Sequence, residues 1–244
     1  MKNYNNKIKS KDLSNLGPDS IVDALGPPHD LPVNNGELNK SIIRPEIYSG
    51  TPIEEIGILK PDVKLKNIDK ITSKGELSNS ESYMETNFST LQRNLDKIGE
   101  VFENKIVVDL GAGKTTLGYS MALMAGAKAY VGVDSHNANS LGRFLNGNHN
   151  DSMTYSVVDL DMLSFLRCVK DDSISMIAAG IDDYVIHDGE YTNPLNKEIK
   201  RTLHPNGGLL SVMSEIYFPD KDKRIIIDGG GRSYIGSQIA ILRK

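Results

Sequence analysis

The sequence has one cysteine, no long apolar run and no excess of positive charge, and each absence excludes a class of protein. The single cysteine, Cys168, permits neither an intrachain disulfide nor a cysteine-clustered zinc site. No run of about 18 apolar residues occurs, so the sequence predicts no membrane-spanning helix. The formal net charge of -4 and the isoelectric point of about 5.8 argue against a protein that binds nucleic acid mainly by electrostatic attraction.

A secretory signal is also not indicated. The basic start of the chain, MKNYNNKIKSKDLSNLG, lacks the apolar core of a signal peptide. We therefore expect a cytoplasmic protein without a membrane partner. With 244 residues, the chain is long enough to bury a substantial core, and its length fits one large domain or one domain with an appendage.

The chain divides into a part with little periodicity and a part with strong periodicity. Over residues 1–78, prolines and glycines interrupt every apolar run, as in LGPPHDLPVNNGEL. We expect this part to be an N-terminal extension that is partly irregular or lid-like. Over residues 79–244, short apolar stretches alternate with amphipathic ones, which predicts a single α/β domain.

The periodic part predicts a doubly wound sheet. KIVVDLG, AYVGVD, MTYSVVDLD, SISMIAAG and GGLLSVMS read as apolar strands separated by helices, which is typical of a parallel sheet with helices on both faces. The tail, RIIIDGGGRSYIGSQIAILRK, reads as two strands around a glycine-rich turn. We expect a mostly parallel, seven-stranded sheet with an antiparallel C-terminal strand. One amphipathic helix before the first strand is predicted from apolar residues at steps of three and four, Phe88, Leu91, Leu95, Ile98 and Phe102.

The segment VVDLGAGKTTLG carries two overlapping nucleotide-binding signals. A P-loop requires glycine at the position of Val108, so a P-loop is excluded. The dinucleotide fingerprint G-x-G-x-x-G fits in part, with Gly111 and Gly113 present and Thr116 in the third place. Asp134 ends the next strand, 21 positions after Gly113, where an acid can accept hydrogen bonds from ribose hydroxyls. Together these residues predict a ligand that contains adenosine.

Asp109 precedes the glycine turn and distinguishes between such ligands. Its carboxylate would repel a pyrophosphate, whereas it would attract an ammonium group directly or through water. With this acid, VVDLGAGKTTLG resembles the first motif of the class I S-adenosylmethionine-dependent methyltransferases. AYVGVD resembles their strand with the ribose-binding acid, SVVDLDML their third motif, and DDSISMIAAGIDD and LHPNGGLLSVMS their fourth and fifth strands. The resemblance covers residues 80–244.

The resemblance implies that the protein binds S-adenosylmethionine and transfers its methyl group to an O or N acceptor, on a small molecule or a peptide. It implies that Asp161 bonds to the adenine amino group and that Met162 packs near the base. The expected cofactor-binding residues are Asp109, Gly111, Ala112, Gly113, Asp134, Ser135, Asp161, Met162 and Gly180.

The catalytic group is not identified by the sequence. GIDDYVIHDGEY, after the fourth strand, offers Asp182, Asp183, Tyr184 and His187, and His187 is the best base by intrinsic pKa. The two adjacent acids do not form a convincing metal site, and no metal is predicted. Thr115 departs from the family's third glycine. No N/D-P-P-Y follows the fourth strand, which argues against methylation of a nucleobase or a glutamine amide.

Two other functions stay open. The chain could bind S-adenosylmethionine as a regulatory protein that has the same fold but does not transfer the methyl group. It could also be an NAD-dependent enzyme, which Asp109 and Thr116 disfavour.

Overall fold

The computed structural model describes seven stretches of the chain: residues 50–65, 80–147, 153–181, 189–214, 216, 220–228 and 239–244. In this part of the chain one seven-stranded sheet has the order β3-β2-β1-β4-β5-β7-β6. The strands are β1 (Ile106–Leu110), β2 (Ala129–Val133), β3 (Thr154–Val158), β4 (Ser175–Ala179), β5 (Leu209–Val212), β6 (Arg224–Asp228) and β7 (Ile239–Leu242).

The pairing of the strands confirms the predicted fold class. Strands β1 to β5 pair in parallel, and β7 is antiparallel to both of its neighbours, β5 and β6. The strand order reverses at β1, because β2 and β3 lie on one side of it and β4 and β5 on the other. In sheets of this kind, ligands bind at the carboxyl ends of the strands beside such a switch point.

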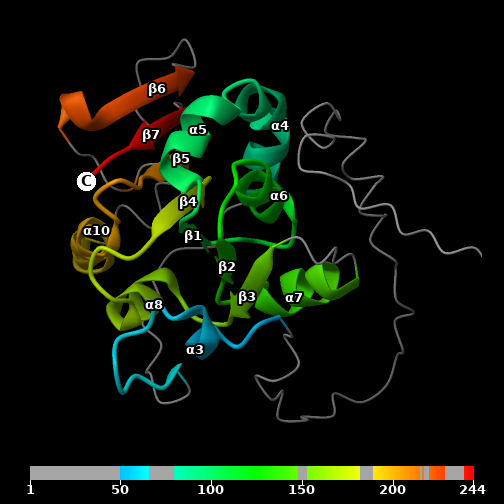
Figure 1. Ribbon diagram of the computed structural model, residues 1–244, viewed down its shortest axis with the longest axis vertical. Coiled ribbons are helices and arrows are strands. Elements are labelled where there is room, and N and C mark those ends of the chain that lie inside the picture. The colour runs from blue at the N-terminus through cyan, green and yellow to red at the C-terminus, as the bar shows by residue number, and fades with distance from the viewer. Residues whose placement is uncertain are drawn as a thin grey trace, which may run out of the picture.

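Helices cover both faces of the sheet (Figure 1). They are α3 (Ile53–Ile56), α4 (Ser80–Gln92), α5 (Leu95–Phe102), α6 (Leu117–Met124), α7 (Ala138–Gly147), α8 (Met162–Cys168) and α10 (Gly189–Thr202). No helix in the described part of the chain is long and apolar enough to cross a membrane.

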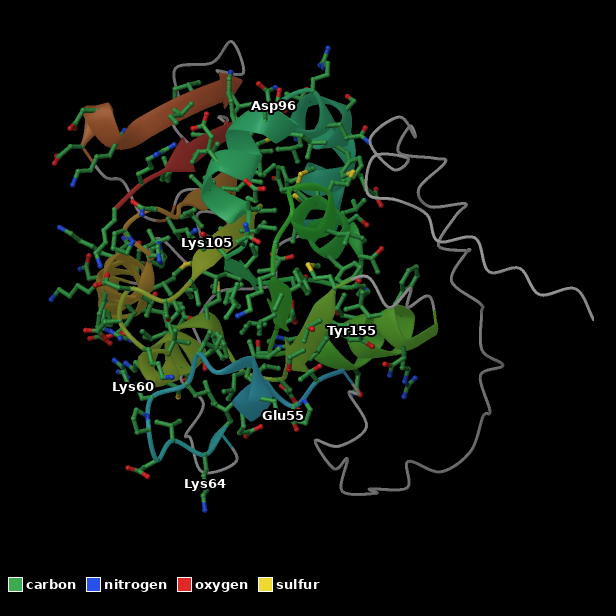
Figure 2. The ribbon with its side chains drawn as sticks, viewed as in Figure 1. Glu55, Lys60, Lys64, Asp96, Lys105 and Tyr155 are labelled. Carbon is green, nitrogen blue, oxygen red and sulfur yellow. The ribbon has the colours of Figure 1, made fainter. Side chains whose placement is uncertain are left out.

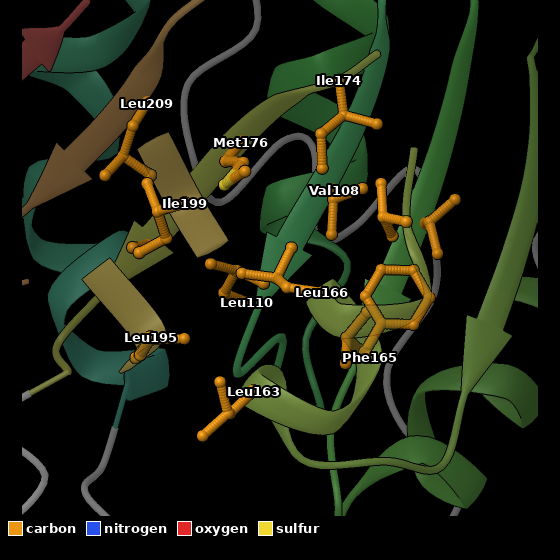
Figure 3. Packing of buried hydrophobic residues seen from close by; sticks show 14 of the residues in the cluster. Val108, Leu110, Leu163, Phe165, Leu166, Ile174, Met176, Leu195, Ile199 and Leu209 are labelled. Atoms are coloured by element: carbon orange, nitrogen blue, oxygen red, sulfur yellow. The ribbon is translucent and has the colours of Figure 1, made fainter. Parts of the chain in front are cut away.

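The core consists of two apolar layers, one on each face. Val108 and Leu110 of β1 belong to the layer beneath α3, α8 and α10, whereas Val107 belongs to the layer beneath α4 to α7. Successive residues of a strand point to opposite faces, so one short apolar strand supplies both layers. Figure 3 shows the first layer, where side chains from α8 and α10 meet those of β1 and β4.

The predicted helix before β1 is two helices, α4 and α5. Asn94 interrupts it, because its side-chain amide donates a 2.9 Å hydrogen bond to the carbonyl of Thr90 in the preceding turn. Asparagine competes in this way with the backbone pattern of a helix. Of the five predicted apolar residues, four are fully buried and Leu95 is partly buried.

Residues 50–65 of the predicted extension pack on the domain. Ile53 and Ile58 join the core layer of α8. The amide of Thr51 donates to the carbonyl of Tyr155 on β3 at 2.8 Å, and the amide of Lys60 donates to the carbonyl of Cys168 at 2.8 Å. Figure 2 shows this segment along the lower side of the molecule as drawn. The boundary at residue 78 stays a prediction.

Candidate functional site

The turn after β1 has left-handed backbone at both fingerprint glycines. The φ angle is 69° at Gly111 and 68° at Gly113, a region that favours glycine. The amides of Gly111 and Ala112 donate to the carbonyl of Val133 on β2, at 2.9 and 3.1 Å. A Cβ atom added to Gly111 would meet no atom within 4 Å. The turn is therefore anchored to β2, and a side chain at Gly111 would contact no atom in the part of the chain that the structure describes.

Asp134, directly after β2, joins this turn to the start of α7. Its Oδ1 accepts hydrogen bonds from the amides of His136 and Asn137, at 2.8 and 2.6 Å, and its Oδ2 accepts from the amide of Gly113 at 3.0 Å. An ionised carboxylate can accept about four hydrogen bonds, so these three leave capacity for about one more. Asp134 thus has a structural role that the sequence did not reveal, beside its predicted role toward a ribose.

Asp109 lies beneath the turn, between β1 and α6. The residue is 5% exposed, and its Oδ2 accepts a 2.9 Å hydrogen bond from the hydroxyl of Tyr130 on β2. A Cβ atom on Gly118 of α6 would lie 1.8 Å from this oxygen, so only glycine leaves room for it. The sequence predicted that Asp109 attracts an ammonium group either by direct contact or through water, and this burial disfavours direct contact. An indirect interaction remains compatible with the geometry.

The surroundings of Asp109 change its acidity. Burial raises the pKa of Asp109 from 3.8 to about 7, the hydrogen bond from Tyr130 lowers it, and the nearby charge of Asp134 raises it. The charge of this carboxyl group is consequently sensitive to small changes around it near neutral pH.

Asp161 begins α8 and caps it. Its Oδ1 accepts a hydrogen bond from the amide of Ser164 at 2.9 Å and from the hydroxyl of Tyr191, on α10, at 3.3 Å. Burial and the charge of Asp161 raise the pKa of Tyr191 above its usual value. Met162, the first residue of α8, packs partly buried against the core. The predicted contacts of Asp161 and Met162 with adenine stay predictions.

The ends of β4 and β5 are tied together beside the glycine turn. Gly180 follows β4 with a φ of 60°, and its amide donates to Val212 at 2.9 Å. The Ser214 hydroxyl donates to the carbonyl of Ala178 and accepts from the amide of Ile181, both at 3.0 Å. Ser214 could not be identified from the sequence, because one serine after an apolar strand carries no distinctive pattern.

The topology brings most of the predicted cofactor residues to one edge. Strands β1, β2 and β4 are neighbours, so Gly111, Asp134 and Gly180 follow parallel strands at the same carboxyl edge. Ser135 lies there too, with its Oγ 2.7 Å from Nδ1 of His136. The catalytic candidates, Asp182, Asp183, Tyr184 and His187, lie outside the described residues. Within the described stretches, no group of three or more His, Cys, Asp or Glu residues could hold a metal ion.

Sequence comparisons find no relative for this chain. No family model matches it, and no curated protein matches it. Structure comparison finds similar solved structures at low sequence identity, and the three that follow are named as methyltransferases.

One is a proposed S-adenosylmethionine-dependent methyltransferase from Methanococcus maripaludis, with 15% identity, a TM-score of 0.40, and coverage of 58% of this chain and 67% of that one. A second is a proposed methyltransferase from Escherichia coli, with 14% identity, a TM-score of 0.44, and coverage of 63% and 84%. A third is protein arginine methyltransferase 10 of Arabidopsis thaliana, with 17% identity and a TM-score of 0.39. The match covers 53% of this chain but only 37% of the Arabidopsis protein.

Proposed function

We propose that this protein is an S-adenosylmethionine-dependent methyltransferase whose cofactor lies across the carboxyl ends of β1 and β2. The observation that carries the proposal is the hydrogen bond between the amide of Gly113 and the carboxylate of Asp134. It joins a glycine turn to a strand-end acid at the switch point of the sheet, where adenosine ligands bind in doubly wound folds. The two features of the sequence signature thus form one local structure.

The charges around the turn favour a cationic cofactor over a dinucleotide. Asp134 is close enough to Asp109 that its charge raises the pKa of Asp109. Two neighbouring carboxyl groups below a turn oppose a pyrophosphate and favour positive charge. S-adenosylmethionine carries an ammonium and a sulfonium and has no phosphate, so it fits this turn better than NAD.

The residues of the chain would bind and orient the cofactor, which supplies an electrophilic methyl group on its sulfonium. In this proposal the turn at residues 111–113 faces the methionine end, Asp134 accepts from the ribose, and Asp161 and Met162 face the adenine. Ala112, Ser135 and Gly180 complete the surroundings. Holding the methyl in line with the acceptor provides much of the rate enhancement in such reactions. We propose an O or N acceptor on a small molecule, with the peptide acceptor as the alternative.

Calorimetric titration tests the cofactor. We expect S-adenosylmethionine and S-adenosylhomocysteine to bind and NAD not to bind. Asp134→Asn should weaken S-adenosylhomocysteine binding by about 1–3 kcal/mol, because a ribose hydroxyl loses a charged acceptor. Binding of NAD alone would contradict the proposal.

Methyl transfer is tested separately, with radiolabelled S-adenosylmethionine and a panel of small-molecule and peptide acceptors. Label transferred to an acceptor supports the enzyme. The regulatory alternative would be favoured by normal cofactor binding without label transfer to any acceptor.

A further inference from the structure

We propose that Tyr130 is a positioning residue for cofactor binding, whose hydroxyl holds the Asp109 carboxylate beneath the glycine turn in the orientation that attracts the ammonium of the cofactor. Tyr130 lies inside β2, within the segment AYVGVD, but is not among the residues that the resemblance assigns to the cofactor. This inference rests on the proposed function and deepens it, because it assigns the recognition of the cationic end of the cofactor to a buried pair.

The register of β1 and β2 places the two side chains together. Asp109 pairs with Gly132, and Tyr130 lies two residues before Gly132, on the same face of the sheet. Tyr130 is fully buried, and its hydroxyl donates to Oδ2 of Asp109 at 2.9 Å. The glycine opposite Asp109 leaves the path between the two groups free.

Two glycines outside the fingerprint make room for this pair. A Cβ atom on Gly132 would lie 3.3 Å from the Tyr130 hydroxyl and 2.6 Å from Cδ2 of Leu141. A Cβ atom on Gly118 would lie 3.3 Å from the same hydroxyl and 1.8 Å from Oδ2 of Asp109. The strand and the helix that enclose the pair therefore both lack a side chain at the point of contact.

A hydrogen-bonded carboxyl group is not needed to fill an apolar core. The neighbours of Tyr130 belong to an apolar layer that includes Val107, Met121 and Leu141. Burying a carboxyl group there costs free energy unless it is well hydrogen-bonded, and apolar side chains of similar volume often stabilise a core as well or better. The position of the pair, directly below the glycine turn, indicates a role toward a ligand.

The charge of Asp109 depends on the groups that face it. Tyr130 on β2 and Asp134 directly after β2 both shift the pKa of Asp109. The other facing residues are Gly118 on α6 and Ile177 on β4, which pairs with Asp109, and neither residue is charged. Tyr130 lowers the pKa of Asp109 by donating to the ionised form, and Asp134 raises it. Loss of the hydroxyl would leave more of Asp109 neutral at pH 7, and a neutral acid attracts an ammonium far less.

The test compares two ligands and two tyrosine variants by calorimetry. S-adenosylhomocysteine carries the ammonium, and 5′-methylthioadenosine shares the nucleoside but lacks the amino-acid end. In Tyr130→Phe we expect about tenfold weaker binding of S-adenosylhomocysteine, and binding of 5′-methylthioadenosine within about twofold of wild type. Tyr119→Phe is the matched control, because its buried ring packs edge-on against Tyr130 with centroids 5.6 Å apart. That variant should bind both ligands like wild type.

A pH series and a double-mutant cycle separate positioning from packing. The affinity for S-adenosylhomocysteine should rise with pH as Asp109 loses its proton, and in Tyr130→Phe this rise should occur at higher pH than in wild type. The ligand titrates in the same way with both proteins, so a difference between the two pH profiles comes from the protein. In Asp109→Asn, which removes the charge, adding Tyr130→Phe should have no further effect on affinity. The variants are first checked for folding by circular dichroism and thermal unfolding.

Three results would overturn the inference. If Tyr130→Phe loses the same amount of affinity for both ligands and its pH profile does not change, the tyrosine only supports the fold. Unchanged binding of S-adenosylhomocysteine would mean that its hydroxyl is not used. If the wild-type protein binds neither nucleoside, the proposed function fails and the inference fails with it. In the first two cases the proposed function stands.

Discussion

The backbone amide of Gly113 donates a 3.0 Å hydrogen bond to Oδ2 of Asp134, so the turn after β1 and the acid after β2 hold each other in place. The remaining bonds of this carboxylate go to the start of α7. A turn that is fixed in this way by hydrogen bonds to a carboxylate needs little further ordering if the proposed cofactor binds there.

Asp134→Ala should destabilise the protein as well as weaken binding. The substitution leaves the amides of Gly113, His136 and Asn137 without their acceptor, and we expect a loss of about 2–3 kcal/mol in the free energy of unfolding. Asp134→Asn keeps one oxygen acceptor and should lose about 1 kcal/mol. Urea denaturation measures both values. Equal stability of Asp134→Ala and wild type would show that the three hydrogen bonds contribute nothing to the fold.

Gly118→Ala should destabilise the protein, although alanine is the better helix former. The new methyl group would lie 1.8 Å from Oδ2 of Asp109, and we expect a net loss of about 1–3 kcal/mol through displacement of the buried carboxyl group. Gly99→Ala on α5 is the control, because its methyl would meet only the carbonyl of Ala125, at 3.9 Å. There we expect a gain of about 0.5–1 kcal/mol from helix propensity. Thermal or urea unfolding measures the stability of both variants. A stabilised Gly118→Ala protein would contradict the placement of Asp109.

Asp109 should make the protein less stable as the pH rises toward neutrality. Its pKa is raised from 3.8 to about 7 in the folded state, so between these values the folded protein binds the proton that the unfolded chain has lost. The stabilisation is fully present below pH 3.8 and is lost as the pH rises through about 7. A difference of about three between the two pKa values corresponds to about 4 kcal/mol.

Asp109→Asn removes this titration and serves as the reference. The difference in unfolding free energy between wild type and Asp109→Asn should change by several kcal/mol between pH 4 and pH 8, to the disadvantage of wild type at the higher pH. Urea denaturation across this range measures it. A constant difference would show that Asp109 titrates normally and is not buried as described.

Ile58→Ala should destabilise the whole domain. Ile58 is 1% exposed and lies in the core layer of α8, so its truncation should cost about 2–4 kcal/mol. The partly buried Ile56 is the comparison, and Ile56→Ala should cost clearly less. A single unfolding transition at lower urea concentration is expected. If a small part of the unfolding signal is instead lost in a separate transition, residues 50–65 unfold independently of the domain.

Local patterns were sufficient to predict most of the fold. The apolar strands, the helices between them and the antiparallel tail follow from periodicity and from glycine-rich turns, whereas the order of the strands in the sheet was not predicted. The break at Asn94 was missed, because the apolar spacing continues across it and only a side-chain hydrogen bond interrupts the helix. An irregular or lid-like extension was expected, but the contacts of residues 50–65 with β3 and α8 were not predicted, since contacts between distant segments leave no local pattern.

The sequence by itself determined that an acid at the end of the first strand precedes two glycines and that a second acid follows the next strand, because these short motifs depend on spacing along the chain. Only the tertiary structure decided what those residues contact. It turned Asp109 into the interior toward Tyr130 and Gly118, and it joined Asp134 to Gly113 across the edge of the sheet. The physical reason is that hydrogen-bond partners and burial depend on strand register and helix placement, which bring together residues 9 to 21 positions apart in the sequence.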